Sequence, residues 1–383
     1  MRSGLAAGIW RSRRERETSK TSPVPEGSSH GEVEGLLALA YGRCARELFW
    51  NIHRKKAGTY EGAELHEGMG AGSRKRTAFC RKRHSGNGVL IIDKPEGITS
   101  FDVVYRLRRL TGQRKIGHTG TLDPMATGVL PLLLGKAARA ESLLPETWKE
   151  YEAGFRLGEE TDTEDSTGKL LSQCERAVSR EELEKALESF RGDILQVPPM
   201  YSALKRDGKK LYELARQGIV VEREPRPVTV YELELLEYGK AGREGRLRIR
   251  CSAGTYVRTL CADLGKALGV GGIMISLRRT AACGFSKKEA LTLEEASALQ
   301  KEGLLSGRIL PVEYLFREFS SLRVTEAQAK RFCNGGELDL HRTTLSGKQF
   351  TGEERFRVLG PGGFLGLGKV DLDAGSLKVL KLF

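Results

Sequence analysis

The segment Gly117-His118-Thr119-Gly120-Thr121-Leu122-Asp123-Pro124 combines two glycines, two threonines, a histidine, an aspartate and a proline in eight residues. This composition is typical of a loop with defined backbone angles. Pro124 disfavours helical geometry at Asp123 and holds that residue extended. An apolar run suited to a strand, Val129 to Leu134, follows shortly afterwards. Asp123 is therefore placed as a fixed carboxylate beside a core strand, although an ordinary Asp-Pro turn has the same composition.

A glycine-rich phosphate-binding loop is the main alternative for this region. That loop requires the pattern GxxxxGK[ST], because its backbone amides, lysine and hydroxyl all contact the nucleotide. From Gly128 to Gly135-Lys136 the glycine spacing is wrong, and Ala137 follows the lysine. The sequence therefore provides no phosphate loop of this type.

Strand and helix signals are interleaved on both sides of this loop. Before it, Val89 to Ile92 predicts a strand, and Thr99 or Ser100 can cap a helix that continues to Leu110. After it, the predicted elements are strands around 151–157, 229–235, 247–251 and 273–277, and helices after the capping residues Ser179 and Thr292 and over 258–268. Several strands follow one another directly, which indicates an α+β fold with a mixed, largely antiparallel sheet flanked by helices.

The pattern changes after Pro311, where the chain becomes strand-like and rich in glycine. One helix and one hairpin are predicted here: a helix capped by Thr325 that ends at Asn334-Gly335-Gly336, and a hairpin from Phe356 to Val370 around Pro361-Gly362-Gly363. We therefore predict a small β-rich domain over residues 309–383. A linker near 303–311 would join it to a larger domain over residues 86–308.

Length and charge limit the class of protein. A chain of 383 residues fits two or three domains, and 39% hydrophobic residues exclude a wholly disordered chain. No apolar run reaches the ~18 residues of a membrane span. The net charge of +13 indicates a polyanionic partner. Residues 1–85 hold 17 Lys+Arg and 9 Asp+Glu, a net of +8, so residues 86–383 carry only +5.

Residues 1–85 differ from the rest of the chain in having no aspartate, many arginines and glycines, and little periodicity. We predict that they form a basic, disordered N-terminal extension. The first fourteen residues hold four arginines and no acid, which would also suit an organelle-targeting segment. If the working protein lacks the extension, Met69 would be a natural start.

Cysteine and histidine usage argues against disulfides and zinc. The seven cysteines are odd in number, and no two have CxxC spacing, so a disulfide framework is disfavoured. Only His118 and His341 lie beyond residue 85, which leaves few ligands for a zinc site. We therefore predict no zinc site.

Three further stretches could carry chemistry. Arg258, where a predicted strand passes into a helix, could pair with a buried carboxylate or lie on the surface. Tyr151 is on an alternating strand, where a tyrosine is most often a packing residue. Basic and aromatic residues interleave from Met200 to Tyr212. That mixture suits RNA, but a solvated helix face would show it as well.

A set of motifs occurs in order over roughly residues 86–300. They are Gly88 to Pro95 with Thr99-Ser100, Gly117 to Pro124, Lys149 to Tyr151, Gly158 to Thr163, Pro199 to Lys205, Gly208 to Tyr212, Ala215 to Gly218, Gly254 to Arg258 and Leu277 to Thr280. Together they resemble the TruB family of tRNA pseudouridine synthases, which implies the pseudouridine synthase fold. The C-terminal segment resembles the small RNA-binding PUA-like domain of bacterial members. Residues 1–85 match nothing in the family.

The resemblance implies isomerisation of uridine 55 in the T-loop of tRNA to pseudouridine. The C1′–N1 bond is broken and the flipped base is rejoined through C5. Nothing is hydrolysed or oxidised, so the resemblance implies no metal and no cofactor. Asp123 would be the essential carboxylate, which either attacks the nucleotide or removes a sugar proton. Arg258 would pair with Asp123 and keep it charged and oriented, and Tyr151 would stack on the uracil.

The resemblance also implies roles around these three residues. His118 would take the place vacated by the flipped base. Tyr256 and the backbone around Leu277 would contact the base or the nucleotide, and Lys94 would support the site from behind. Residues of about 202–226 would form an insertion that clamps the T-arm.

By the same resemblance, the partner would be tRNA, and the protein would be a cytoplasmic monomer without an obligate protein partner. The N-terminal extension leaves organelle targeting open. Two other functions also remain open: a non-catalytic RNA-binding protein on the same scaffold, and the same chemistry on another RNA. Asp123 together with Tyr151 and Arg258 favours the enzyme, because a binding protein has no need of a carboxylate there.

Overall fold

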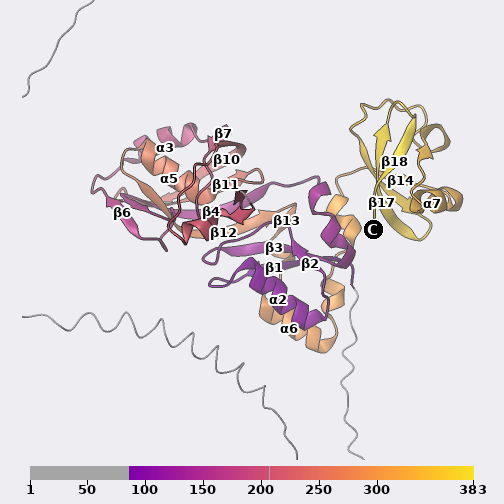
Figure 1. The fold of residues 1–383 in the computed structure, drawn as a ribbon, viewed down its shortest axis with the longest axis horizontal. Coiled ribbons are helices and arrows are strands. Elements are labelled where there is room, and N and C mark those ends of the chain that lie inside the picture. The colour runs from indigo at the N-terminus through magenta and orange to yellow at the C-terminus, as the bar shows by residue number, and fades with distance from the viewer. Residues whose placement is uncertain (1–85, 207) are drawn as a thin grey trace, which may run out of the picture. The chain divides into compact units, whose positions relative to one another are not determined.

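The computed structural model describes residues 86–206 and 208–383, so the predicted extension over residues 1–85 lies outside the described part. A nine-stranded sheet has the central order β1-β3-β12-β4-β11-β10-β7, with β2 paired to β3 and β13 paired to β12 (Figure 1). Its strands are β1 (Gly88–Lys94), β2 (Ile116–His118), β3 (Thr127–Leu134), β4 (Lys149–Leu157), β7 (Gly192–Gln196), β10 (Arg226–Tyr238), β11 (Glu244–Cys251), β12 (Gly272–Ala282) and β13 (Phe285–Ser286).

The neighbouring strands of this sheet run antiparallel except for β3 and β12, which pair in parallel through Thr127–Arg278 and Gly128–Arg279. The predicted mixed, largely antiparallel sheet is therefore confirmed. Gly128 allows the parallel contact, because its φ is +110° and a Cβ there would lie 2.2 Å from the Arg279 carbonyl oxygen.

Four helices pack on this sheet: α2 (Ser100–Thr111), α3 (Arg180–Glu188), α5 (Val257–Ala267) and α6 (Leu293–Glu302). Thr99, Ser179 and Thr292 cap α2, α3 and α6, and each side chain accepts a hydrogen bond from the backbone amide three residues later. Of the two caps that the sequence offered for α2, Thr99 is the one used, and the other predicted capping boxes are confirmed. None of the helices in the described residues is both long and apolar enough to cross a membrane.

Two apolar cores form where these helices meet the sheet. Leu183 of α3 and Leu264 of α5 share one core with Phe155 of β4. Val104 of α2 and Ala296 of α6 share the other with residues of β1 and β3. Figure 1 shows the same grouping, with α3 beside α5 and α2 beside α6. The sheet is therefore flanked by two separate helix pairs, as the α+β interpretation requires.

Two small hairpins lie outside the nine-stranded sheet, between its strands in the sequence. β5 (Glu159–Thr161) pairs with β6 (Leu170–Gln173), and β8 (Lys205–Arg206) pairs with β9 (Lys209–Lys210), which leads directly into α4 (Leu211–Ala215). The second hairpin and α4 lie within the stretch 202–226 that the resemblance assigns to the T-arm.

A second, five-stranded sheet follows, in the order β14-β16-β17-β18-β15. Its elements are β14 (Ser321–Arg323), α7 (Glu326–Cys333), β15 (Leu338–Asp339), β16 (Arg355–Gly360), β17 (Gly363–Asp371) and β18 (Ser376–Leu382). β16 and β17 form the predicted hairpin and α7 is capped by Thr325, so both predictions are confirmed. The stretch expected as a linker is held against the first sheet, because Val89 and Leu310 exchange two backbone hydrogen bonds of 2.8 Å.

Candidate active site

The loop between β2 and β3 is fixed by backbone contacts on both sides of Asp123. The buried Ser100 hydroxyl accepts a hydrogen bond from the Leu122 amide at 2.8 Å and lies 3.2 Å from the Leu122 carbonyl oxygen, to which it donates. The Pro124 carbonyl accepts from the Gly97 amide at 2.9 Å. The Asp123 side chain nevertheless stays 38% exposed. A carboxylate with a fixed backbone and open access suits a reacting group.

Arg258, in the first turn of α5, lies between two carboxylates. Its Nε is 3.1 Å from Asp123 Oδ2, and its Nη1 is 3.6 Å from Asp165 Oδ2. The guanidinium also donates to the carbonyl oxygens of Thr163 at 3.0 Å and Tyr201 at 2.9 Å. The Arg258 side chain is only 7% exposed, so these contacts hold it in a single orientation toward Asp123.

The pKa of Asp123 reflects opposing influences. Burial is the largest and raises it, and the nearby Asp165 carboxylate raises it further. Arg258 and Lys94 act in the opposite direction, but the net result is a pKa above the ordinary aspartate value. The predicted pairing with Arg258 is therefore present, while burial outweighs its effect on the protonation of Asp123.

Lys94 is completely buried at the end of β1, immediately behind this loop. Its Nζ donates to the carbonyl oxygens of Pro95 at 2.9 Å and Pro124 at 3.3 Å. Burial lowers the pKa of Lys94 to about 8, and the negative charge of Asp123 limits the decrease. The lysine thus joins β1 to the loop that contains Asp123.

Tyr151 lies on β4, directly between Ile249 on β11 and Arg279 on β12. It is almost fully buried, and burial raises the pKa of its hydroxyl. The Arg279 guanidinium is completely buried and donates to the carbonyl oxygens of Val129 at 2.7 Å and Gly120 at 3.1 Å. Arg279 therefore links β4, the strand of Tyr151, to β3 and to the loop that carries Asp123.

The other three predicted residues lie on adjoining elements. His118 ends β2, its Nδ1 accepts from the Gly120 amide at 3.3 Å, and burial together with the charge of Arg279 lowers its pKa. Tyr256 precedes α5, and its backbone exchanges hydrogen bonds of 3.0 and 3.2 Å with the Gln196 side chain. Leu277 pairs with Ala153 of β4 and is buried.

Direct contacts thus unite only part of the predicted set. Asp123 pairs with Arg258, and Lys94 contacts Pro124, the residue after Asp123. Tyr151 and His118 lie around Arg279, whose guanidinium reaches the same loop. This arrangement combines an accessible carboxylate, a buried cation that orients it and a buried aromatic ring. Such a site could hold an unstacked nucleobase beside a carboxylate that acts as a nucleophile or as a general base.

Two family models match consecutive parts of the chain. The TruB family pseudouridylate synthase N-terminal domain matches residues 108–257, and the tRNA pseudouridylate synthase B C-terminal domain matches residues 258–317. A protein of Azoarcus sp. (strain BH72) described as tRNA pseudouridine synthase B is 46% identical over 299 residues, which cover 77% of this chain and 94% of that protein. The chain belongs to the TruB family. A protein of the same description from Escherichia coli O9:H4 (strain HS) is 40% identical, with 79% and 98% covered.

Two solved structures have a fold similar to that of this chain. A structure described as "Crystal Structure of a Cbf5-Nop10-Gar1 Complex" matches with a TM-score of 0.61 and 26% identity, covering 79% of this chain and 86% of that one. A structure of an H/ACA RNP bound to a substrate RNA matches with a TM-score of 0.59 at 24% identity, covering 77% and 84%. These matches confirm the pseudouridine synthase fold predicted for this TruB family member.

Sequence reasoning missed Asp165 and gave Arg279 no role of its own. Asp165 is buried in a turn, where its carboxylate accepts from the Thr163 hydroxyl at 2.8 Å and from the Thr167 amide and hydroxyl at 3.0 and 2.6 Å. The signal for Asp165 was its position in a Thr/Asp/Ser-rich turn, where short polar side chains commonly bond to nearby backbone groups. The signal for Arg279 was a cation in alternation with Leu277, an apolar residue on the inward face of the same strand.

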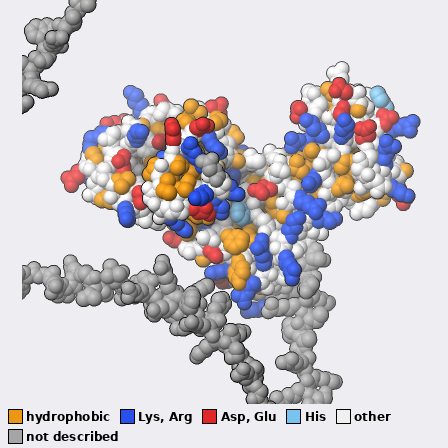
Figure 2. Space-filling model, viewed as in Figure 1, with side chains coloured by type: hydrophobic (Ala, Val, Ile, Leu, Met, Phe, Trp, Pro, Cys, Tyr) orange, Lys and Arg blue, Asp and Glu red, His pale blue; other side chains and the backbone are white. Residues whose placement is uncertain are grey.

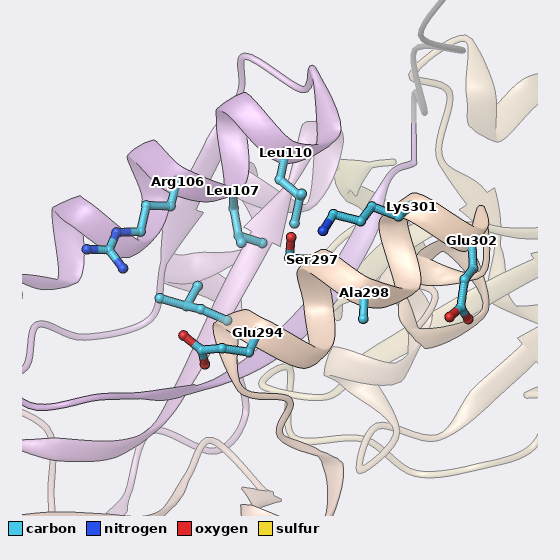
Figure 3. Close-up of a pocket in the computed structure, with 9 residues that line it drawn as sticks. Arg106, Leu107, Leu110, Glu294, Ser297, Ala298, Lys301 and Glu302 are labelled. Atoms are coloured by element: carbon cyan, nitrogen blue, oxygen red, sulfur yellow. The ribbon is translucent and has the colours of Figure 1, made fainter.

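A groove of about 580 Å³ lies away from this site, between α2 and α6. Figure 3 shows Leu107 and Leu110 of α2 facing Ser297 and Ala298 of α6 across it. None of the predicted site residues lines the groove, so the candidate chemistry of this TruB family member does not involve it.

Proposed function

We propose that the protein isomerises a uridine of tRNA to pseudouridine, with uridine 55 of the T-loop as the target. The observation that carries the proposal is the ion pair between the accessible Asp123 carboxylate and the buried Arg258 guanidinium at 3.1 Å. The description "tRNA pseudouridine synthase B" of relatives that are 40–46% identical supports the assignment.

The reaction is an isomerisation, so its atoms must balance without a co-substrate. The C1′–N1 bond breaks, the C1′–C5 bond forms, and the hydrogen lost from C5 is balanced by one gained at N1. Asp123 starts the sequence either by attacking the nucleotide or by removing a sugar proton, and an ionised carboxylate suits both roles. Arg258 orients that carboxylate and favours its charged form, against the effect of burial.

The surrounding residues would hold the flipped nucleotide. Uracil must leave the base stack before it can rotate, at a cost of a few kcal/mol. Tyr151 would stack on the extruded uracil and His118 would fill the space it leaves. Tyr256 and the backbone at Leu277 would contact the nucleotide, and Lys94 would keep the Asp123 loop in register. These contacts would offset part of the unstacking cost.

The remaining parts of the chain would bind the rest of the tRNA. We assign residues 86–308 to catalysis, residues of about 202–226 to the T-arm, and residues 309–383 to RNA binding as a PUA-like domain. Lys210 and Arg216 each lie 5.3 Å from the Tyr212 ring centroid, a basic and aromatic combination that suits RNA. We further propose a cytoplasmic monomer that acts without an obligate protein partner.

The test is conversion of an unmodified tRNA transcript by the purified protein, with pseudouridine mapped chemically. We expect product at the T-loop uridine and a loss of about a thousandfold or more in kcat for Asp123→Asn, because the amide neither attacks nor removes a proton. The matched control is Asp373→Asn, which changes the same group at an exposed position between β17 and β18 and should leave kcat unchanged.

Three results would contradict the proposal or part of it. Absence of product from the wild-type protein together with tight tRNA binding would indicate a binding protein on this scaffold. Product from Asp123→Asn at the wild-type rate would remove Asp123 from the chemistry. Product on another RNA and none on tRNA would support the proposed isomerisation but contradict the assignment of tRNA as its substrate.

A further inference from the structure

Helix α2 leaves two large aromatic side chains in solvent. Phe101 is 62% exposed and Tyr105 is 51% exposed, and they lie one helical turn apart on the same face. The opposite face buries Val103, Val104 and Leu107 in the core beneath the helix. The core therefore does not account for the two exposed rings, which form an apolar patch without a partner in the described chain.

The charges around these rings are almost all positive. The Arg108 guanidinium lies 5.7 Å from the Phe101 ring centroid, and that of Arg109 lies 6.0 Å from the Tyr105 centroid. The one acid of α2, Asp102, is engaged in the capping box with Thr99. Figure 2 shows hydrophobic side chains bordered by Lys and Arg side chains over α2. Flat apolar rings among cations match the bases and phosphates of a single-stranded nucleic acid.

Two sets of hydrogen bonds join α2, the helix that carries the patch, to segments of the candidate active site. Ser100, next to Phe101, is hydrogen-bonded to Leu122, the residue before Asp123. Arg108 Nη2 donates to the Ile116 carbonyl at 3.1 Å, on the strand that ends at His118. A nucleotide chain that delivers a base to Asp123 therefore passes close to this helix.

We propose that Phe101, Tyr105, Arg108 and Arg109 form an RNA-binding surface, the α2 surface, which stacks on unpaired nucleotides of the loop that contains the target uridine. The inference rests on the proposed function and goes beyond it by identifying the part of the RNA that α2 contacts. The rings provide stacking, and the arginines neutralise the adjacent phosphates.

The test compares binding and turnover of the wild-type protein with the double variant Phe101→Ala/Tyr105→Ala on an isolated T-arm stem-loop. Both rings are exposed, so the variant should fold, and circular dichroism checks this. We expect the Kd for the stem-loop to rise about tenfold or more and kcat at saturating RNA to stay unchanged. Phe101→Tyr/Tyr105→Phe keeps both rings and should restore binding.

The matched control is Tyr231→Ala, which removes a 54%-exposed ring from β10 and should leave Kd unchanged. An unchanged Kd for the double variant would overturn the inference. A Kd that rises for full-length tRNA but not for the stem-loop would also overturn it, because the surface would then contact another part of the tRNA. If the wild-type protein modifies no uridine, the proposed function fails; if it is active and the double variant matches it, only the α2 surface fails.

Discussion

The two sheets of the protein bury different kinds of side chain. Within or beside the nine-stranded sheet, Lys94, Asp165, Arg258 and Arg279 are buried with their charges. In the described residues of the five-stranded sheet, Ser376 is the only buried polar side chain, and the core consists of apolar residues such as Phe332 and Leu377. The charged residues there lie toward solvent, as in the pair between Lys369 and Glu353.

Under the proposed function, this difference separates residues that support chemistry from residues that support a fold. A buried charge costs stability unless other groups satisfy it, so a sheet that only has to fold has no reason to contain one. Arg258 is satisfied by two carboxylates and two carbonyls. The first sheet thus tolerates costly groups that fix a carboxylate, whereas the second sheet gains its stability from apolar packing.

Removing one paired cation beside the first sheet and one from the second tests this comparison most strongly. Arg258→Ala leaves Asp165 buried and without its cation, so we expect the free energy of unfolding to fall by about 3–5 kcal/mol. We also expect kcat/KM to fall about a thousandfold or more, because Asp123 loses the group that orients it. Denaturant unfolding and turnover on tRNA measure the two effects.

Lys369→Ala is the matched control for Arg258→Ala. It breaks a 3.0 Å pair whose Glu353 partner is largely exposed, so the expected loss is about 1 kcal/mol or less, with unchanged kcat. Equal losses of stability in the two variants would show that burial of the charged pair has no special cost here.

The pH dependence of catalysis tests the buried lysine. The pKa of Lys94 is lowered to about 8, so its positive charge beside Asp123 is present below that pH and lost above it. We expect kcat/KM, which reports ionisations of the free enzyme, to fall about fivefold across a transition centred near pH 8. Lys94→Arg keeps its charge at these pH values and should abolish the transition. Persistence of the transition in Lys94→Arg would assign it to another group.

The local signals in the sequence predicted most of the fold. Capping residues such as Ser179 and Thr292 placed helix starts correctly, because a cap depends on residues within one turn. Strand alternation placed β4 and β11, and the Gly-rich turn after Gly360 placed the β16–β17 hairpin. The parallel contact between β3 and β12 was not predicted, because it joins segments about 150 residues apart and depends on tertiary packing.

The candidate site was predicted in part for the same reason. The Asp123 loop was evident from its own residues, and the motif resemblance supplied Arg258 and Tyr151. Asp165 needed the folded chain, because nothing local in the sequence indicates which carboxylate faces the second side of Arg258. The direction in which the pKa of Asp123 shifts also could not be predicted without the folded chain, because burial is a property of the assembled loop.

A small effect is also expected beside the five-stranded sheet, at the cap of α7. Thr325→Ala removes the hydroxyl that accepts from the Gln328 amide at 3.3 Å, so the free energy of unfolding should fall by about 1 kcal/mol. Because Thr325 touches none of the buried charges, kcat should stay at the wild-type value. Denaturant unfolding and turnover at saturating tRNA check this, and a fall in kcat would show that the two sheets are coupled energetically.

The parallel pairing of β3 with β12 has a consequence for the time at which the protein becomes active during synthesis. Asp123 emerges from the ribosome long before α5 and β12, which carry Arg258 and Arg279. A nascent chain that ends after β11 therefore has the carboxylate without the groups that fix it. Only a chain translated through β12 can close the sheet around Gly128, so the groups that surround the Asp123 loop come together late in synthesis.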